Sequence, residues 1–201
     1  MSDFKLLLAS SSPFRRQVLN KLRIPFECAS PDIDETPLPR EKPQQYVERL
    51  AVEKAQALAE QFNDHWIIGS DQCSVVDGKI CGKPHTVEKA QQQLKLSSGK
   101  AVHFYTGICL LNAKTGEHQS VTEPFSVHFR ELDDEEIKRY IELEMPLKCA
   151  GSFMVEGLGI NLFEKLEGRD ENSLIGLPLI ALLQLMRSAG LNPLALAQPD
   201  N

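Results

Sequence analysis

Two basic residues in the 201-residue sequence interrupt apolar helix faces, as cations that bind phosphate often do. Lys54 lies four residues from both Leu50 and Leu58, within the apolar stripe of a predicted helix, where its ammonium must reach solvent or an anion. Arg15 shares a predicted helix face with Val18 in the same way. Each could also be a residue whose stem packs inward while its charge emerges at a cleft edge.

A short hydroxyl-rich loop precedes Arg15. The apolar run that ends at Ala9 is followed by Ser10-Ser11-Ser12-Pro13 and then by a predicted helix. Because the N–H groups at a helix N-terminus attract anions, Ser10, Ser12 and Arg15 suggest a phosphate cradle. Ordinary helix capping, with Ser12 as N-cap and Pro13 at the first helical position, explains the same residues, and both interpretations can hold.

Carboxylates supply the opposite charge. Asp71 and Gln72 follow the apolar run 66–70, so we expect them at the end of a buried strand, where α/β proteins bind ligands. A strand-terminal aspartate can also simply begin a turn. A loop flanked by prolines holds three more carboxylates, which could be Mg²⁺ ligands or only a solvated acidic loop: Asp32, Asp34 and Glu35.

A third cation, Lys83, lies in Gly82-Lys83-Pro84, where the following proline restricts its backbone. Cations together with carboxylates are what metal-assisted phosphoryl chemistry needs. No Walker-type GxxxxGK[ST] loop is present, which disfavours a P-loop nucleotide hydrolase.

The elements that must position these residues alternate between strand-length apolar runs and stretches of helical period, which predicts an α/β fold. Strands are expected near 5–9, 26–29, 66–70, 102–111 and 120–130. Helices are expected near 13–22, 43–62, 87–96, 134–144 and 179–189. Asp77-Gly78 predicts a tight hairpin turn. Residues 114–116 separate two long strands, which indicates an antiparallel pair and hence a mixed sheet, and Asp133 with Glu136 predicts a helix capping box.

Composition limits the class of protein. The net charge of -6 and pI near 5.4 disfavour a nucleic-acid polymer as partner. Neither a signal peptide nor an apolar stretch long enough to span a bilayer is visible, so we expect a soluble, cytoplasmic protein without a membrane partner. The five cysteines form no metal-binding pattern and are expected to be reduced and mostly buried. One domain over residues 1–201 is expected, with a loosely ordered tail from about residue 192.

Ordered motifs over nearly the whole chain resemble the Maf family of nucleotide pyrophosphatases. They are Ser10-Ser11-Ser12-Pro13-Phe14-Arg15-Arg16, Asp34-Glu35-Thr36, Glu53-Lys54-Ala55, Gly69-Ser70-Asp71-Gln72, Gly82-Lys83-Pro84, Tyr105-Thr106-Gly107, Ala150-Gly151-Ser152-Phe153 and Ile175-Gly176-Leu177-Pro178. The resemblance implies a mixed, twisted sheet flanked by helices, with two lobes around a central cleft. It also implies a hydrolase of acid anhydrides that cuts a nucleoside triphosphate between its α- and β-phosphates and uses Mg²⁺ or Mn²⁺.

The resemblance also assigns roles to residues. Asp71 would be the proton acceptor and a metal ligand, and Glu35 the second metal ligand. Lys54 and Lys83 would act on the triphosphate as catalytic cations. The substrate would also be bound by Arg15, Ser10 and Ser12. A homodimer is common in such relatives and is expected here.

Within that family the chain resembles the subgroup acting on 7-methyl-GTP, because it has Phe14, Gln72 and Glu156. The enzymes acting on dTTP and UTP instead have Ser-Pro-Arg-Arg at the first motif, Asp-Thr at the base and Gln before the later Gly. An aromatic face can stack on a cationic methylated base, and a carboxylate can accept its N–H groups. The usual aromatic residue of the subgroup is tryptophan, so phenylalanine predicts weaker selectivity. The alternatives are a pyrophosphatase for dTTP, UTP or other modified nucleotides, and a non-catalytic nucleotide-binding regulator of cell division.

Overall fold

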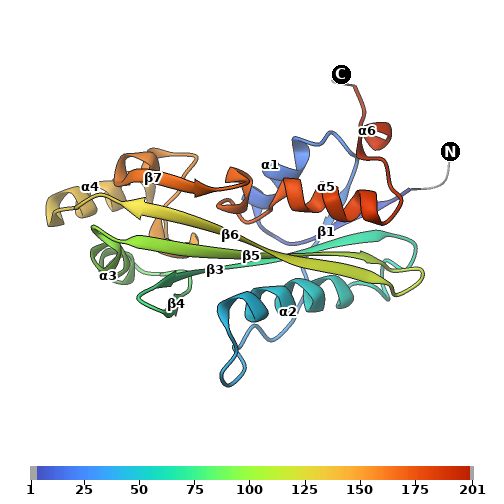
Figure 1. The fold of residues 1–201 in the computed structure, drawn as a ribbon, viewed down its shortest axis with the longest axis horizontal. Coiled ribbons are helices and arrows are strands. Elements are labelled where there is room, and N and C mark those ends of the chain that lie inside the picture. The colour runs from blue at the N-terminus through green and yellow to red at the C-terminus, as the bar shows by residue number, and fades with distance from the viewer. Residues whose placement is uncertain (1–3, 200–201) are drawn as a thin grey trace.

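One long mixed sheet runs through the part of the chain that the computed structural model describes, residues 4–199 (Figure 1). Its seven strands are arranged in the order β2-β1-β3-β5-β6-β7, with β4 paired to β3. Strand β1 is parallel to β2 and β3, and the other pairs are antiparallel. The strands are β1 (Leu6–Ala9), β2 (Glu27–Ala29), β3 (Trp66–Val76), β4 (Lys79–Cys81), β5 (Ala101–Asn112), β6 (His118–Phe129) and β7 (Phe163–Gly168).

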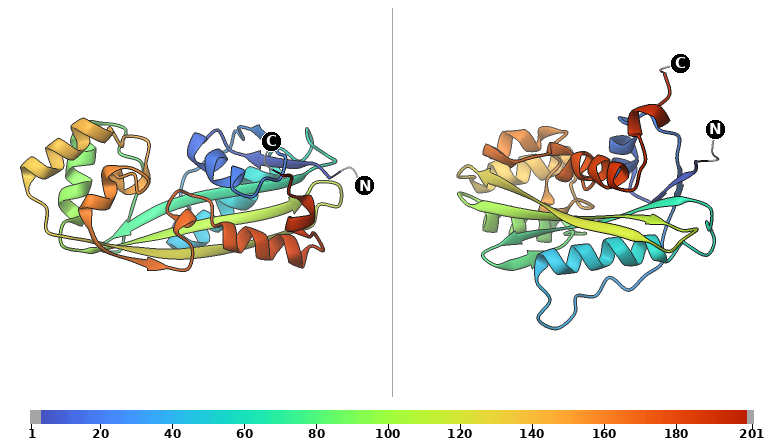
Figure 2. Two further views of the ribbon diagram at one scale, coloured as in Figure 1. Left: turned by 90° about the horizontal axis from the view of Figure 1, so that it is seen from above. Right: turned by 45° about the vertical axis from the view of Figure 1, so that its right-hand side comes forward.

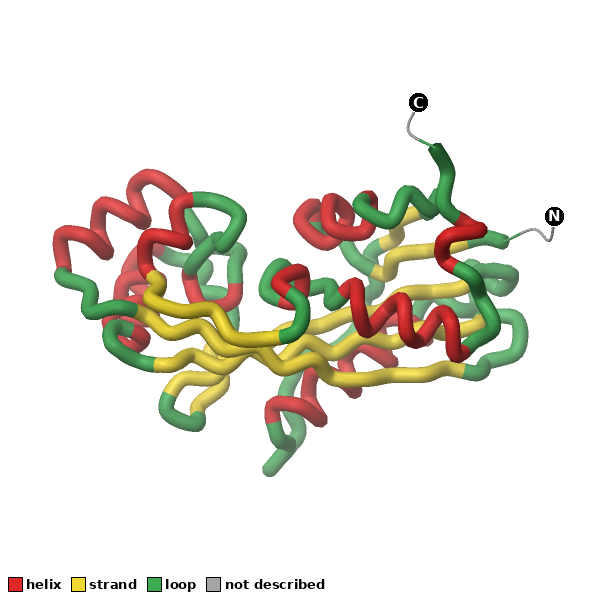
Figure 3. The backbone as a smooth tube through the Cα atoms, turned by 45° about the horizontal axis from the view of Figure 1, so that its top comes forward, coloured by secondary structure: helices red, strands yellow, loops and turns green. Residues whose placement is uncertain are grey.

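Helices cover the two ends of this sheet and form two lobes, with the long strands crossing from one lobe to the other (Figures 2 and 3). The first lobe contains α1 (Pro13–Asn20), α2 (Pro43–Gln56), α5 (Leu179–Ser188) and α6 (Pro193–Leu196). The second contains α3 (Val87–Ser97), α4 (Asp134–Glu144) and the short 3₁₀ turns η1 (Ala150–Ser152) and η2 (Leu158–Leu162), while η3 (Glu171–Ser173) precedes α5. The predicted α/β class, mixed sheet and two-lobed arrangement are confirmed.

Strand alternation decides which helix covers which face of the first lobe. Successive strand side chains point to opposite faces, so Leu8 and Ile68 belong to the core beneath α1 and α5, whereas Leu7 and Ile67 belong to the core beneath α2. The sheet is therefore buried on both faces at this end, and its strands read as nearly continuous apolar runs.

An aromatic cluster centres the core of the second lobe. Phe153 makes edge-to-face contacts with Phe104, Phe129 and Phe163, with ring centroids 5.4, 5.7 and 4.8 Å apart. Apolar residues of α3 and α4 pack around these rings. The second lobe thus has its own core, distinct from the core clusters of the first lobe.

Several local predictions hold. Asp77 and Gly78 both have positive φ, 48° and 76°, as a type I′ hairpin turn requires. Asp133 and Glu136 form the predicted capping box at the start of α4, and Ser12 caps α1 by accepting a hydrogen bond from the Arg15 N–H. All five cysteines are free, although only Cys73 and Cys109 are buried.

Other predictions require correction. The strand expected over 66–70 continues to Val76, so Asp71 and Gln72 lie inside β3 and not at its end. The reason is the pairing of β3 with β5. This pairing extends from Trp66 to Val75 of β3 and outweighs the poor strand propensity of aspartate. Helix α2 ends at Gln56, short of the expected residue 62.

Two further features were not expected. Strand β7 was missed because half of its sequence, Phe-Glu-Lys-Leu-Glu-Gly, is charged and most of it is exposed, so that its antiparallel pairing with β6 makes it a strand. The segment from Asn192, expected to be loosely ordered, contains α6, and Leu196 packs against the first-lobe core. Of the helices that the structure describes, none combines the length and the apolar character that crossing a membrane would require.

The outer edge of β3 is left open at its centre. Strand β1 pairs with Trp66–Ile68 and β4 with Ser74–Val76, both along the edge that does not face β5. Among residues 4–199 no strand covers this edge between those two segments. Asp71 and Gln72 fall in this gap, which is why residues inside a strand can face the space between the lobes.

Candidate active site

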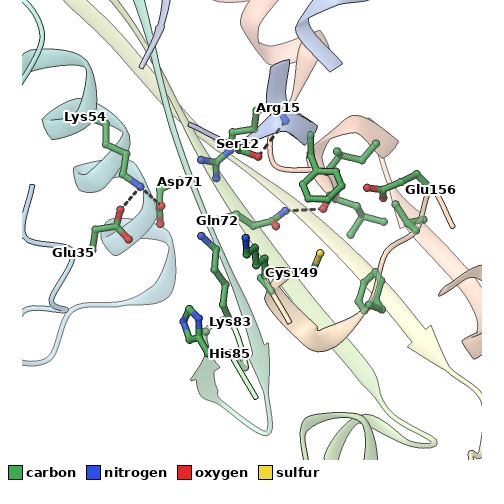
Figure 4. A pocket seen from close by; sticks show the side chains of 18 of the residues that line it. Ser12, Arg15, Glu35, Lys54, Asp71, Gln72, Lys83, His85, Cys149 and Glu156 are labelled. Atoms are coloured by element: carbon green, nitrogen blue, oxygen red, sulfur yellow. Dashed lines mark hydrogen bonds and ion pairs between the residues drawn. The ribbon is translucent and has the colours of Figure 1, made fainter. Parts of the chain in front are cut away.

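A cavity of about 250 Å³ lies between the two lobes and gathers the predicted functional residues (Figure 4). Its lining includes Ser12, Phe14, Arg15, Glu35, Lys54, Asp71, Gln72, Lys83 and Glu156. Ser10 lines a neighbouring cavity of about 320 Å³, which shares several of these residues. Each residue to which the family resemblance assigns a role therefore lies at one connected cleft, whereas Asp32 and Asp34, the other candidate metal ligands of the acidic loop, line neither cavity.

Two glycines set how closely α2 approaches the sheet. A Cβ atom on Gly69 would lie 1.9 Å from the Ala51 carbonyl oxygen, and one on Gly107 would lie 2.1 Å from that of Val47. Because neither strand residue has a side chain, the α2 backbone rests directly on β3 and β5. This contact places Lys54 against Asp71, which pairs with Gly107 across the sheet.

The Lys54 ammonium bridges two carboxylates. Its Nζ lies 2.6 Å from Asp71 Oδ1 and 2.7 Å from Glu35 Oε1. Lys54 and Asp71 are both buried, with 7% of each residue exposed, so the attraction between them is weakly screened by water. Glu35 belongs to a loop and keeps 54% of its side chain exposed.

Local charges also fix the ionisation of Glu35. Partial burial alone would raise the pKa of this carboxyl, but the hydrogen bond and charge of Lys54, with the charges of Lys83 and Arg15, outweigh burial and lower it. Glu35 is consequently an anion at neutral pH and available as an oxygen ligand.

The two carboxylates suit a hard divalent cation. Since Asp71 Oδ1 and Glu35 Oε1 each contact the same ammonium nitrogen, they lie no farther apart than the sum of those two contact distances. Among residues 4–199 no group of three or more His, Cys, Asp or Glu side chains is arranged to hold a metal ion. This donor set fits Mg²⁺ better than a metal that needs an all-protein cage, because Mg²⁺ is typically held by one or two carboxylates, with substrate phosphates and water completing its shell.

Tyr46 and Arg49 of α2 hold the Glu35 loop in place, and neither had been predicted. The Tyr46 hydroxyl donates to the Glu35 carbonyl oxygen at 2.9 Å, and Arg49 Nη2 donates to the Thr36 carbonyl oxygen at 3.2 Å. Burial, with the nearby Asp71 and Glu35 carboxylates, raises the pKa of Tyr46 to about 12, so its hydroxyl remains a donor at neutral pH. No periodic pattern signals this contact, because both residues also suit an ordinary helix surface.

Arg15 is anchored on the opposite side of the cleft. Its Nε donates to the Gly176 carbonyl oxygen at 2.8 Å, and the Ser70 hydroxyl donates to the same oxygen at 2.8 Å. Burial lowers the pKa of the Arg15 guanidinium, while the charges of Asp71 and Glu35 oppose that change. Arginine stays charged under such conditions, and half-buried Arg15 therefore presents a fixed positive charge.

Gln72 points to the sheet face opposite Asp71, because the two residues are adjacent in one strand. Its amide nitrogen donates to Thr106 Oγ1 at 3.1 Å and to the Leu174 carbonyl oxygen at 3.2 Å, and also to the Ser173 carbonyl. Backbone carbonyls only accept hydrogen bonds, so the NH₂ group must face them. Gln72 Oε1, which no donor among residues 4–199 contacts, is left as an acceptor.

The second lobe contributes Lys83, Glu156 and three residues that the sequence did not single out: His85, Lys148 and Cys149. Burial and the Glu156 charge, against the opposing charge of Lys83, raise the pKa of the Cys149 thiol to about 11, which makes it a poor nucleophile at neutral pH. These residues lie on connecting segments that reach the cleft only through the fold of the second lobe, so short sequence motifs could not reveal them.

Comparison with known proteins agrees with this architecture. The sequence model of a family described as "Maf-like protein" matches residues 5–189. Among solved structures, the chain is similar to the Ham1 protein of Staphylococcus aureus, with a TM-score of 0.52 and 14% sequence identity over 92% of this chain and 99% of that one. At that identity the likeness concerns the fold alone.

Proposed function

The chain belongs to the Maf-like protein family, and from this premise we propose that it hydrolyses nucleoside triphosphates to a nucleoside monophosphate and pyrophosphate. The observation that carries the proposal is the buried Lys54 ammonium between Asp71 and Glu35. It lies in a cleft that Arg15 and Lys83 also line. A polyphosphate with a divalent cation is the ligand whose charges complement this set.

The proposed reaction is attack of water on the α-phosphorus. A bond forms between the water oxygen and the α-phosphorus, the bond to the bridging oxygen breaks, and pyrophosphate leaves. Asp71 accepts the proton: its Oδ1 is held by Lys54, while Oδ2 makes no hydrogen bond within residues 4–199 and is free to orient the water.

The cations of the cleft stabilise the charge that accumulates on the departing pyrophosphate. Arg15 is fixed by its bond to Gly176, and Lys54 by its two carboxylates, so little reorganisation is needed as the reaction proceeds. A divalent metal, held by Glu35 and Asp71 when bound, would supply further neutralisation of phosphate charge.

A screen of common and modified triphosphates with Mg²⁺ and Mn²⁺, measuring pyrophosphate release, tests the proposal. We expect stoichiometric pyrophosphate and nucleoside monophosphate, with no nucleoside diphosphate. Release of inorganic phosphate instead would place the cut at another bond. Tight nucleotide binding without any product would favour the alternative, a non-catalytic regulatory protein.

For the base, we propose 7-methyl-GTP as the preferred substrate. Phe14 lies on the first lobe and Glu156 on the second, and both line the cleft together with Gln72. Gln72 Oε1 and the Glu156 carboxylate are both acceptors, which suits the N–H edge of guanine. The ring of Phe14 suits a base that methylation has made cationic.

Replacing Glu156 should weaken this preference. In Glu156→Gln the negative charge is lost and an NH₂ group can face the N–H donors of the base, so we expect the ratio of kcat/KM for 7-methyl-GTP over UTP to fall about tenfold. Glu164→Gln, an equally exposed carboxylate of β7 outside the cavity, is the matched control. An unchanged ratio in Glu156→Gln would show that this carboxylate does not read the base.

A further inference from the structure

The cavity beside the serine loop, which is Ser10-Ser11-Ser12, is closed by lysines from the other lobe. On the first lobe its lining includes Ser10, Ser12 and Arg15. Of the described residues that line it, only Lys83 and Lys148 belong to the second lobe. This cavity therefore has hydroxyls, a helix N-terminus and the Lys54–Glu35 ion pair on one side, and two lysines on the other.

A backbone hydrogen bond holds the two lysine segments side by side. The His85 N–H donates to the Leu147 carbonyl oxygen at 3.0 Å, joining the segment after β4 to the segment after α4. His85 has a positive φ of 61°, so the chain turns sharply just after Lys83. Lys83 and Lys148 are each two residues or fewer from this bond, and they approach the cleft as a pair.

Neither lysine is paired with a carboxylate of the described residues, although the charge of Lys83 interacts with that of Glu35, which lines the same cavity. Among residues 4–199, no carboxylate lies within ion-pair distance of the Nζ atom of Lys83 or Lys148, whereas Lys54 is bound by two. Both residues are exposed. The two lysines carry like charges and line one cavity, so an anion bound between them and the serine loop would lower their mutual repulsion.

Resting on the proposed function, we propose that Lys148 is a further substrate-binding residue that holds the pyrophosphate portion of the triphosphate from the second lobe. The base side of the cleft is marked by Phe14, Gln72 and Glu156. Lys148 lines both the cavity that these residues share and the cavity beside the serine loop. Its contact with the terminal phosphates would draw the second lobe toward the serine loop when substrate binds.

Calorimetric titration with inorganic pyrophosphate and Mg²⁺ tests this inference without requiring turnover. Lys148→Met keeps the side-chain length and removes the charge, and we expect Kd for pyrophosphate to rise about tenfold, as for loss of one charge-assisted contact. Lys148→Arg should stay within about threefold of the unchanged protein. Lys138→Met, an exposed lysine of α4 in the same lobe, controls for net charge and should change Kd less than twofold.

Each result of the titration either supports or overturns the proposed role of Lys148. A selective loss in Lys148→Met, with an unchanged melting temperature, supports the role of Lys148. Equal Kd values for Lys148→Met and Lys138→Met overturn it, and so does an unchanged protein that fails to bind pyrophosphate. If pyrophosphate binds through Lys148 but no triphosphate is hydrolysed, the proposed reaction fails while the Lys148 site stands.

Discussion

Asp71→Asn is expected to lower kcat for triphosphate hydrolysis by about 10³-fold. Asparagine has the size of aspartate and keeps an oxygen that can accept from Lys54, but it cannot take a proton from water. Because the lost interaction belongs to the chemical step, KM should change much less than kcat. Steady-state kinetics with a saturating divalent metal measures both constants.

The control for this variant must separate chemistry from stability, since Asp71 is also half of a buried ion pair. Lys54 still has Glu35 as a partner in the variant, so the protein should remain folded with a modestly lower melting temperature. Asp77→Asn, in the exposed turn after the same strand, should leave turnover unchanged, because asparagine tolerates the positive φ at that position. Near-wild-type turnover by a folded Asp71→Asn variant would show that another group accepts the proton.

Lys54 and Arg15, which line the cleft, could be singled out from the sequence for a physical reason. Lys54 breaks an apolar helical stripe and Arg15 follows a strand–loop–helix junction, and both signals are local. The α/β class followed from alternating periods in the same way. In each case the residues that carry the signal are neighbours in the chain.

The errors concern partners that are distant in the chain. Asp71 was expected at a strand end because aspartate has a low propensity for strand interiors. Pairing with β5 instead extends β3 well past this residue. Strand β7 exists only through β6, and the Tyr46 contact with the Glu35 loop depends on how that loop folds back. Such features depend on contacts between segments that are far apart in the sequence, and a short stretch of sequence does not reveal these contacts.

The open edge of β3 explains how Asp71, which lies inside a strand, can still face the cleft. A strand end would have delivered Asp71 to the rim of the sheet, but the interior of β3 delivers it to the middle of the cleft, between β1 and β4. There α2 can cover one face of the strand and supply Lys54, while Gln72 faces the other. The residues proposed for catalysis, Asp71 and Lys54, thus lie on the opposite face of the sheet from Gln72, which is proposed to read the base.

Gly69→Ala is expected to destabilise the protein by about 3 kcal/mol and to disrupt the site together with the fold. The added Cβ would lie 1.9 Å from the Ala51 carbonyl oxygen, and a backbone atom of a packed helix cannot move aside cheaply. Relief requires α2 to lift from β3, which would lengthen the Lys54–Asp71 contact. For a chain of this size we expect the melting temperature to fall by about 6–12 °C.

Gly82→Ala gives the matched comparison for stability, because a Cβ there meets no atom within 4 Å and the residue has no positive φ. Its melting temperature should stay within about 2 °C of the unchanged protein, since a surface substitution of this kind alters stability by about 0.5 kcal/mol at most.

If Gly69→Ala melted at the same temperature as Gly82→Ala, α2 would not rest on the strand as described. In that case, the placement of Lys54 against Asp71 would need another cause. A lower melting temperature accompanied by weaker binding of inorganic pyrophosphate would instead tie the helix contact to the charge arrangement of the cleft, since α2 carries Lys54.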